Sequence, residues 1–125
     1  MNETNELVPL LPARLEWPTT LHLAALRRLW AHAQGETGQS RVTSAFLLGL
    51  YNGRRFPFDL TNFRLLDNSL ICDCLAVLEM DSTPKREVHD LLGAPNHQFE
   101  ALASYWGHAD IQRLRAGDAN RDRQG

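Results

Sequence analysis

Residues 38–78 read GQSRVTSAFLLGLYNGRRFPFDLTNFRLLDNSLICDCLAVL and hold the features that decide the fold. Apolar residues recur with helical spacing in two segments, 41–53 and 68–80. Val42, Phe46 and Leu50 share one side of the first segment, and apolar neighbours cover most of its other sides, which is typical of a central, buried helix. Gly49 costs this helix ~1 kcal/mol relative to alanine, so we expect another helix to cross closely at that position.

The second segment predicts a helix that begins after Asp67, whose carboxylate can accept hydrogen bonds from the free amides of the first turn. Its expected inward face consists of Leu70, Ile71, Cys74, Leu75 and Leu78. We expect Asp73 and Glu79 to face water.

The connection between the two segments is rich in aromatic residues. Phe56 and Phe58 should anchor this loop on the core. Asp59 or Thr61 should then cap a short helical turn over residues 60–66.

Before this stretch, residues 20–34 predict a helix with a broad apolar face. Thr19 or Thr20 can cap its start, and Gly35 is expected to end it in the left-handed conformation. Ser40 is the expected cap of the central helix.

After it, residues 84–92 predict a short amphipathic helix that Gly93 ends. Asn96 should cap the last core helix, in which Phe99, Leu102 and Trp106 share one face.

No useful segment alternates with the period of a strand, so the predicted fold class is all-α: a single compact bundle of four to five helices, formed by residues 18–116. Prolines at positions 9, 12 and 18 prevent a regular helix across residues 1–17, which we expect to form an extended arm, packed on the domain or gripping a partner. Residues 117–125 have nothing to bury and predict a disordered tail.

Charge is distributed unevenly along the chain. Residues 27–66 carry six arginines against two acids, and residues 67–100 carry seven acids against two basic residues. The candidate partner-binding residues are accordingly the arginines and acids of these segments: Arg41, Arg54, Arg55, Arg64, Asp73, Glu79 and Asp81. Two interpretations remain open: a surface that binds phosphates or a charged partner, and a solvated face with internal ion pairs to Glu36, Asp59 and Asp67.

The usual signatures of catalysis and metal binding do not occur in the sequence. No two histidines have the H-x-x-x-H spacing, and Cys72 and Cys74 are one residue apart, unlike a C-x-x-C motif. The sequence also contains no phosphate-binding loop and no G-x-S-x-G motif. We therefore predict a protein that is not an enzyme, with no catalytic residue, metal or cofactor, and two reduced thiols; an unrecognised enzyme ranks third among the functional hypotheses.

No apolar run approaches the roughly 18 residues of a membrane span. The first residues carry acids where a secretory signal needs basic residues. We therefore expect a cytoplasmic protein without membrane contact.

From Ala25 to Trp106 the sequence resembles an uncharacterised, all-helical domain family of proteobacterial mobile elements, namely integrative conjugative elements and prophage-like islands. The motifs that carry the resemblance are GQSR at 38–41, FLL at 46–48, FDLT at 58–61, the acidic segment 67–78 and FEAL at 99–102. Residues 50–53, LYNG, depart from the family's W-W-N-A. The resemblance implies a shared fold, and no functional residue is carried over from it.

The function hypothesis follows from the charge pattern and the resemblance. We expect a protein-interaction module encoded by a mobile element, in its sharpest form an anti-CRISPR-type inhibitor that binds a host protein or nucleoprotein complex of defence. The alternative is a nucleic-acid-binding accessory protein or transcriptional regulator of the element, with the same arginines on phosphates. The apolar central helix also allows a homodimer.

Overall fold

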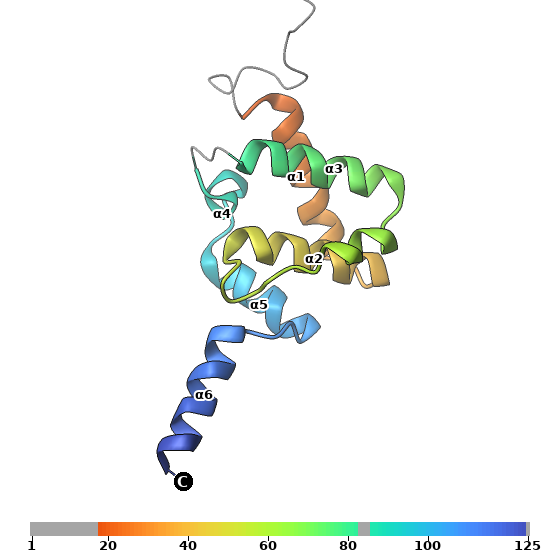
Figure 1. Cartoon of the computed structure of the whole chain (residues 1–125). Coiled ribbons are helices and arrows are strands. Elements are labelled where there is room, and N and C mark those ends of the chain that lie inside the picture. The colour runs from red at the N-terminus through yellow and green to blue at the C-terminus, as the bar shows by residue number, and fades with distance from the viewer. Residues whose placement is uncertain (1–17, 83–85, 125) are drawn as a thin grey trace, which may run out of the picture.

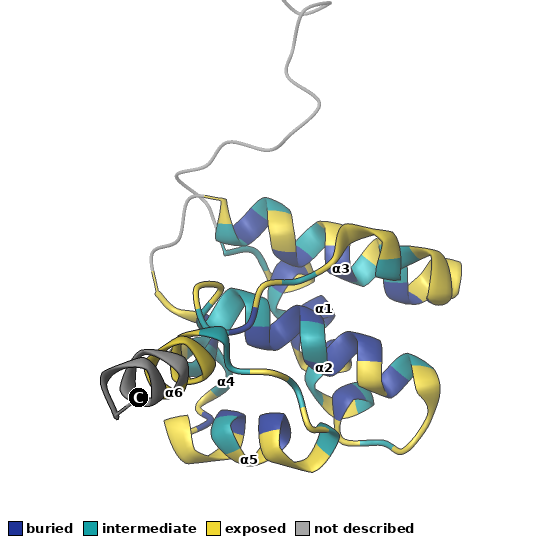
Figure 2. Cartoon of the chain, turned by 60° about the horizontal axis from the view of Figure 1, so that its bottom comes forward, coloured by how far each residue is buried: buried dark blue, intermediate teal, exposed yellow. Residues whose placement is uncertain are grey.

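The computed structural model describes residues 18–82 and 86–124, with side chains as far as Gly117. Over these residues it contains six α-helices, one 3-10 helix and no strand, and their buried side chains form one core (Figures 1 and 2). The predicted all-α fold and single compact bundle are confirmed. The predicted arm, residues 1–17, lies outside the described residues.

Helices α1 (Thr20–Ala33) and α3 (Asn68–Asp81) cross one another and form the largest contact between helices in the domain (Figure 1). Thr19 caps α1, as the sequence predicts, and accepts a hydrogen bond from the amide of His22. Gly35 does not adopt the left-handed conformation, because α1 already ends at Gln34 with right-handed geometry. A Cβ on Gly35 would instead lie 2.8 Å from Ser40 Oγ, so lack of space explains glycine there.

The central helix is α2 (Gly38–Tyr51), and most of its length is buried between α1 and α5. Its cap is Thr37 rather than Ser40, because the helix begins one turn earlier than the apolar pattern does. Ser40 lies inside the first turn and is buried. Burial on most sides, predicted from the sequence, is confirmed.

Gly49 allows a close approach, although the neighbour is a loop and not a helix. A Cβ on Gly49 would lie 3.3 Å from Phe58 Cβ and 3.4 Å from the carbonyl oxygen of Phe56. The loop after α2 therefore returns along α2. It leads to the 3-10 helix η3 (Leu60–Leu65), capped by Asp59, where Phe46, Phe58 and Phe63 form an aromatic cluster.

Asp67 caps α3 as predicted, but the inward face of this helix differs from the prediction. Leu75 and Leu78 are 56% and 36% exposed, whereas Val77 and Met80 are buried. Because apolar residues occur on nearly all sides of α3, their period alone does not determine which side meets α1. Cys74 is buried and Cys72 exposed, both as free thiols.

Helices α4 (Val88–Leu92) and α5 (Asn96–Trp106) complete the core. Both end in a left-handed glycine, Gly93 at φ 64° and Gly107 at φ 69°. Pro95, not Asn96, precedes the first residue of α5. Phe99 is fully buried and stacks on Tyr51 of α2, so α5 packs on the central helix.

Helix α6 (Ile111–Gln124) projects away from the bundle (Figure 1). It runs through 117–124, most of the segment for which we predicted a disordered tail. Its residues from Gln112 to Gly117 are exposed.

Candidate functional site

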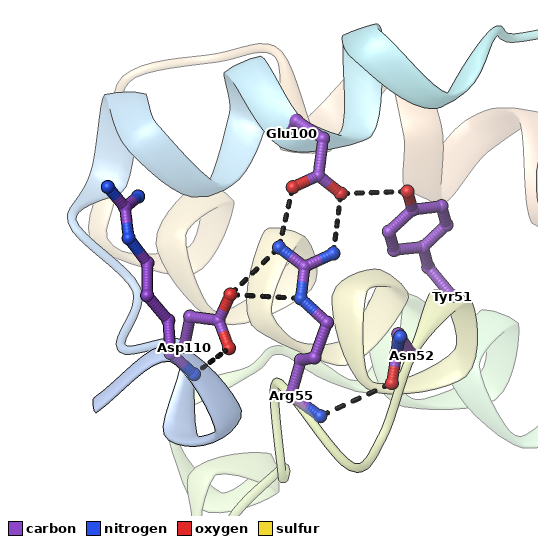
Figure 3. A network of polar contacts seen from close by, with 6 residues as sticks. Tyr51, Asn52, Arg55, Glu100 and Asp110 are labelled. Carbon is purple, nitrogen blue, oxygen red and sulfur yellow. Dashed lines mark hydrogen bonds and ion pairs between the residues drawn. The ribbon is translucent and has the colours of Figure 1, made fainter. Parts of the chain in front are cut away.

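Arg55, one of the predicted partner-binding residues, is bound within the chain (Figure 3). Its two terminal nitrogens donate to the carboxylate of Glu100 in α5, at 2.8 and 2.6 Å. Nε donates to Asp110 Oδ2 at 2.9 Å, just before α6. Tyr51 Oη donates to Glu100 Oε2 at 2.7 Å. The loop after α2, the middle of α5 and the residue before α6 are thus joined through one guanidinium.

This network changes the acidity of its members. Hydrogen bonds from Arg55 hold the pKa values of Glu100 and Asp110 below their usual ranges, and the same bonds raise the pKa of Arg55. Partial burial, followed by the hydrogen bond to Glu100, raises the pKa of Tyr51. The four groups therefore stay in the charge states that stabilise the network at neutral pH. The sequence interpretation with internal ion pairs holds for Arg55, but with partners other than the three acids we expected.

The predicted acidic surface on α3 is also engaged within the chain. Asp73 accepts two hydrogen bonds from Arg28 of α1, at 3.0 and 2.8 Å. Glu79 Oε1 lies 2.7 Å from Nε2 of His22, a histidine that is buried. The expectation that Asp73 and Glu79 face water is corrected, because both carboxylates lie in the contact with α1.

Asp81, the third predicted acid, ends α3. Burial, and secondly the charge of Glu87, raises its pKa to about 6. A binding role for these three acids stays a prediction.

The other three predicted arginines, Arg41, Arg54 and Arg64, are exposed. None of their guanidinium groups makes an ion pair with another residue in the described part of the chain. Arg41 lies in the first turn of α2 and Arg54 in the turn that follows its end, so about 15 Å of helix, at a rise of 1.5 Å per residue, lies between them. The four predicted arginines therefore do not form one continuous stripe.

Arg41 faces a shallow hollow between the start of α2 and the η3 region. The hollow has a volume of about 320 Å³ and is lined by Arg41, Val42, Ala45, Pro57, Phe58, Asp59, Asn62, Leu65 and His108. Arg64 adjoins Leu65 in the chain and helps to lower the pKa of Asp59, after the hydrogen bonds from Thr61. Arg41 therefore lines the hollow and Arg64 lies next to one of its lining residues, whereas Arg54 does neither.

Two exposed leucines give this surface an apolar part that the sequence analysis missed. Leu60 is 71% exposed and Leu65 is 63% exposed. In a 3-10 helix every third residue shares a face, so Leu60, Phe63 and Leu66 lie on one side and Arg64 and Leu65 point elsewhere. That side is buried at Leu66 and exposed at Leu60, the first residue of η3. We call Arg41, Leu60, Arg64 and Leu65 the η3 surface. A period of three, applied to residues 60–66, is the signal that would have separated Leu65 from the core residues.

His108, which lines this hollow, contacts the buried Ser44. Ser44 Oγ lies 2.7 Å from His108 Nε2 and donates to the carbonyl oxygen of Arg41 at 2.7 Å. While the hydroxyl donates to that carbonyl, only the Nε2–H tautomer of His108 can hydrogen-bond to Oγ. A serine nucleophile activated by a histidine base needs the opposite direction. Burial and the charge of Arg41 lower the pKa of His108, so it is neutral at pH 7.

Among the described residues, no group of three or more histidines, cysteines or acids could hold a metal ion. Likewise, no described helix is both long enough and apolar enough to cross a membrane.

Residues 23–107 match the sequence model of a family described as a family of unknown function, DUF7673. The matched part begins three residues into α1, runs through α5 and includes the whole η3 surface. No curated protein and no solved structure matches the chain.

Proposed function

The chain belongs to the family DUF7673, and from its own surface we propose that it is a non-enzymatic protein-interaction module. The observation that carries the proposal is the η3 surface, where two leucines more than 60% exposed adjoin two arginines without ion pairs among the described residues. Arginine is enriched among the residues that contribute most to protein–protein binding, and the centres of such interfaces are more apolar than the rest of the surface. The expected partner surface has an apolar centre with carboxylates at its edge.

In its sharpest form, the proposal is an inhibitor encoded by a mobile element. It acts in the cytoplasm and occupies a functional surface of a host nucleoprotein complex of defence, as anti-CRISPR proteins do. Two observations support the proposal of such an inhibitor. The sequence resembles a domain family of mobile elements, and the candidate site is an exposed surface rather than a group of reactive side chains. The partner would be a protein of the complex and not its nucleic acid.

The alternative is a regulator that binds nucleic acid, and one specific observation favours it. Arg41, Arg54 and Arg64 are exposed and free of ion pairs within the described residues, so each is available to a phosphate. Three phosphate contacts would make the logarithm of the binding constant fall with the logarithm of salt concentration with a slope of about −3.

The test captures partners of the tagged full chain from host lysate, with and without nuclease. The variant Arg41→Glu/Arg64→Glu reverses the charge of the η3 surface, and Arg27→Glu/Arg115→Glu reverses two exposed arginines elsewhere as a matched control. We expect the unchanged protein to capture a protein complex that resists nuclease treatment. The control variant should capture the same amount of this complex, and Arg41→Glu/Arg64→Glu at least 10-fold less. Equal capture by both variants, with unchanged circular dichroism, would refute the assignment of the η3 surface.

A second pair of variants separates the two functions. Leu60→Ser/Leu65→Ser removes the apolar part of the η3 surface without changing charge, and Leu114→Ser replaces a leucine that is 54% exposed on α6. The interaction module loses its partner only with the first variant. If the protein is instead a regulator, both leucine variants keep their affinity for nucleic acid at low salt and lose it at high salt.

A further inference from the structure

An apolar strip on the edge of α3 is only partly covered by the described residues: Ile71 packs against the core, whereas Leu75 and Leu78 are exposed. Ile71, Leu75 and Leu78 follow one another at the spacing i, i+4, i+7 and therefore share one side of the helix. Leu75 is 56% exposed and Leu78 is 36% exposed. Leu21, in the first turn of α1, is 79% exposed. We call Ile71, Leu75 and Leu78 the α3 strip.

The α3 strip lies beside the point at which the described chain begins. Glu79 follows Leu75 by four residues, on the same side of α3, and its carboxylate is 2.7 Å from His22 Nε2. His22 is only four residues after Pro18, the first described residue. Whatever precedes Pro18 therefore enters next to the C-terminal end of the α3 strip.

The preceding 17 residues have the composition to cover it. They include Leu7, Val8, Leu10, Leu11, Leu15 and Trp17, far more apolar side chains than a solvated tail carries. Pro9 and Pro12 exclude a regular helix across the segment and favour an extended course.

The length of residues 1–17 and their covalent attachment at Pro18 favour this segment over a second molecule as the occupant of the α3 strip. The α3 strip spans seven residues of helix, roughly 10 Å, which about four extended residues can cover. A short tether holds the segment at an effective concentration in the millimolar range, well above that of a second copy in solution.

We propose that residues 1–17 dock in an extended conformation along the α3 strip and cover Leu75, Leu78 and Leu21. The occupant is the chain's own N-terminal segment, held by apolar contact alone. This proposal is independent of the η3 surface and of the partner proposed above.

Disulfide trapping in the full chain tests the contact. In a Cys72→Ser background, Leu15→Cys is combined with Leu75→Cys and, in a second protein, Leu11→Cys with Leu75→Cys. The control combines Leu15→Cys with Arg27→Cys, an exposed position nine residues along α1 that the tether can also reach. Cys74 stays in place, because burial raises its pKa to about 12 and leaves it unreactive.

With a mild oxidant, we expect an intramolecular crosslink that forms at least 10-fold faster in one of the Leu75 proteins than in the control. Equal rates in all three proteins would overturn the docking. A crosslinked dimer in place of the monomer would also overturn it and make a second copy the occupant.

A measurement without new cysteines guards against altered folding. Leu75→Ser should lower Tm by about 3–6 °C in the otherwise unchanged chain, because a covered leucine is lost. In the background Leu10→Ser/Leu11→Ser/Leu15→Ser, the same substitution should lower Tm by less than half as much, because the two sites interact. Equal losses in both backgrounds would contradict the proposal.

Discussion

Arg55 shows how one side chain joins three parts of the chain. Its guanidinium binds Glu100 and Asp110, and its carbonyl oxygen accepts a hydrogen bond from the amide of Ile111 at 2.8 Å. Replacement by alanine removes the charge-assisted bonds and leaves two carboxylates close together. We expect Arg55→Ala to lower the free energy of unfolding by about 1–2 kcal/mol, measured by urea denaturation.

The adjacent Arg54 is a matched control for this measurement. Arg54 is exposed and makes no ion pair within the described residues, so Arg54→Ala should change stability by less than about 0.5 kcal/mol. Arg55→Lys keeps the charge but not the forked geometry, and its effect should lie between those two. Similar losses from the two alanine variants would show that the network contributes nothing to folding.

Asp81 should make stability depend on pH in an unusual direction for an acid. Its folded pKa is raised to about 6, whereas an aspartate in an unfolded chain titrates at about 3.9. Between these values the folded state holds a proton that the unfolded state has released, so this group destabilises the fold as pH rises from 4 to 6. Its position at the C-terminal end of α3, where the helix dipole disfavours negative charge, acts in the same direction.

Asp81→Asn removes this dependence. The variant should have a higher Tm than the unchanged protein at pH 7 and nearly the same Tm at pH 4, as measured by calorimetry in matched salt. A Tm difference of the same size at both pH values would mean that Asp81 titrates as an exposed acid.

At this scale the sequence predicts which groups are charged but not their partners. Glu100 and Asp110 lie 45 and 55 residues from Arg55, and no local spacing connects them. Asp73 and Glu79 appear to be solvent-facing acids in a helical projection until α1 is placed against α3.

Two helices end at left-handed glycines, and the second of them directs the chain from α5 toward α6. Gly107 has φ 69°, and the next amide, of His108, donates to the carbonyl oxygen of Ala103 at 3.0 Å. A side chain disfavours this conformation, so Gly107→Ala should lower the free energy of unfolding by about 1 kcal/mol. Urea denaturation measures this loss.

Gly117→Ala is the control at the same residue type. Gly117 lies in α6, and a Cβ there would meet no atom within 4 Å. Alanine favours helix, so this variant should be as stable as the unchanged chain or slightly more stable. If both alanine variants leave the free energy of unfolding unchanged, a side chain at position 107 is not strained by the left-handed conformation.

For the elements, side-chain chemistry predicts helix starts better than it predicts helix orientation. Thr19, Asp59 and Asp67 are caps as expected, because each has an oxygen at the right distance from free amides. The start of α2 was placed too late, because Ser40 and Thr37 have the same capping chemistry and only the fold decides between them. The predicted inward side of α3 was wrong at Leu75 and Leu78, because this helix has no clearly polar side that would show which residues face solvent.

At the scale of the whole molecule, α6 should be the least stable helix among the described residues. It projects from the bundle, and Leu114 is 54% exposed (Figure 1). We expect amides of residues 112–124 to exchange with solvent orders of magnitude faster than those of α1, α2 and α3, in a hydrogen-exchange experiment. A stop after residue 116 should leave Tm unchanged.

Slow exchange throughout α6, or a marked loss of Tm on truncation, would show that this helix contributes to the stability of the domain. Either result would also contradict the expectation from the sequence that residues 117–125 form a disordered tail.

The all-α fold and the single core could be predicted because helical periodicity and capping residues agree along the whole domain. The candidate surface could be predicted only in part. Arg41 and Arg64 were expected, but their separation from Arg54 and their proximity to Leu60 and Leu65 depend on how the loop after α2 returns along that helix. Such a return leaves no local signal in the sequence.

The pairing of α1 with α3 has a consequence for the synthesis of the chain. Asp73 and Glu79 follow their partners Arg28 and His22 by 45 and 57 residues. At a translation rate of about 5–20 residues per second, the ribosome needs roughly 2–11 s to add the later residue after the earlier one. During that time the apolar face of α1 has emerged without the helix that covers it, so the nascent protein is most exposed to chaperones and to misassociation before α3 is made.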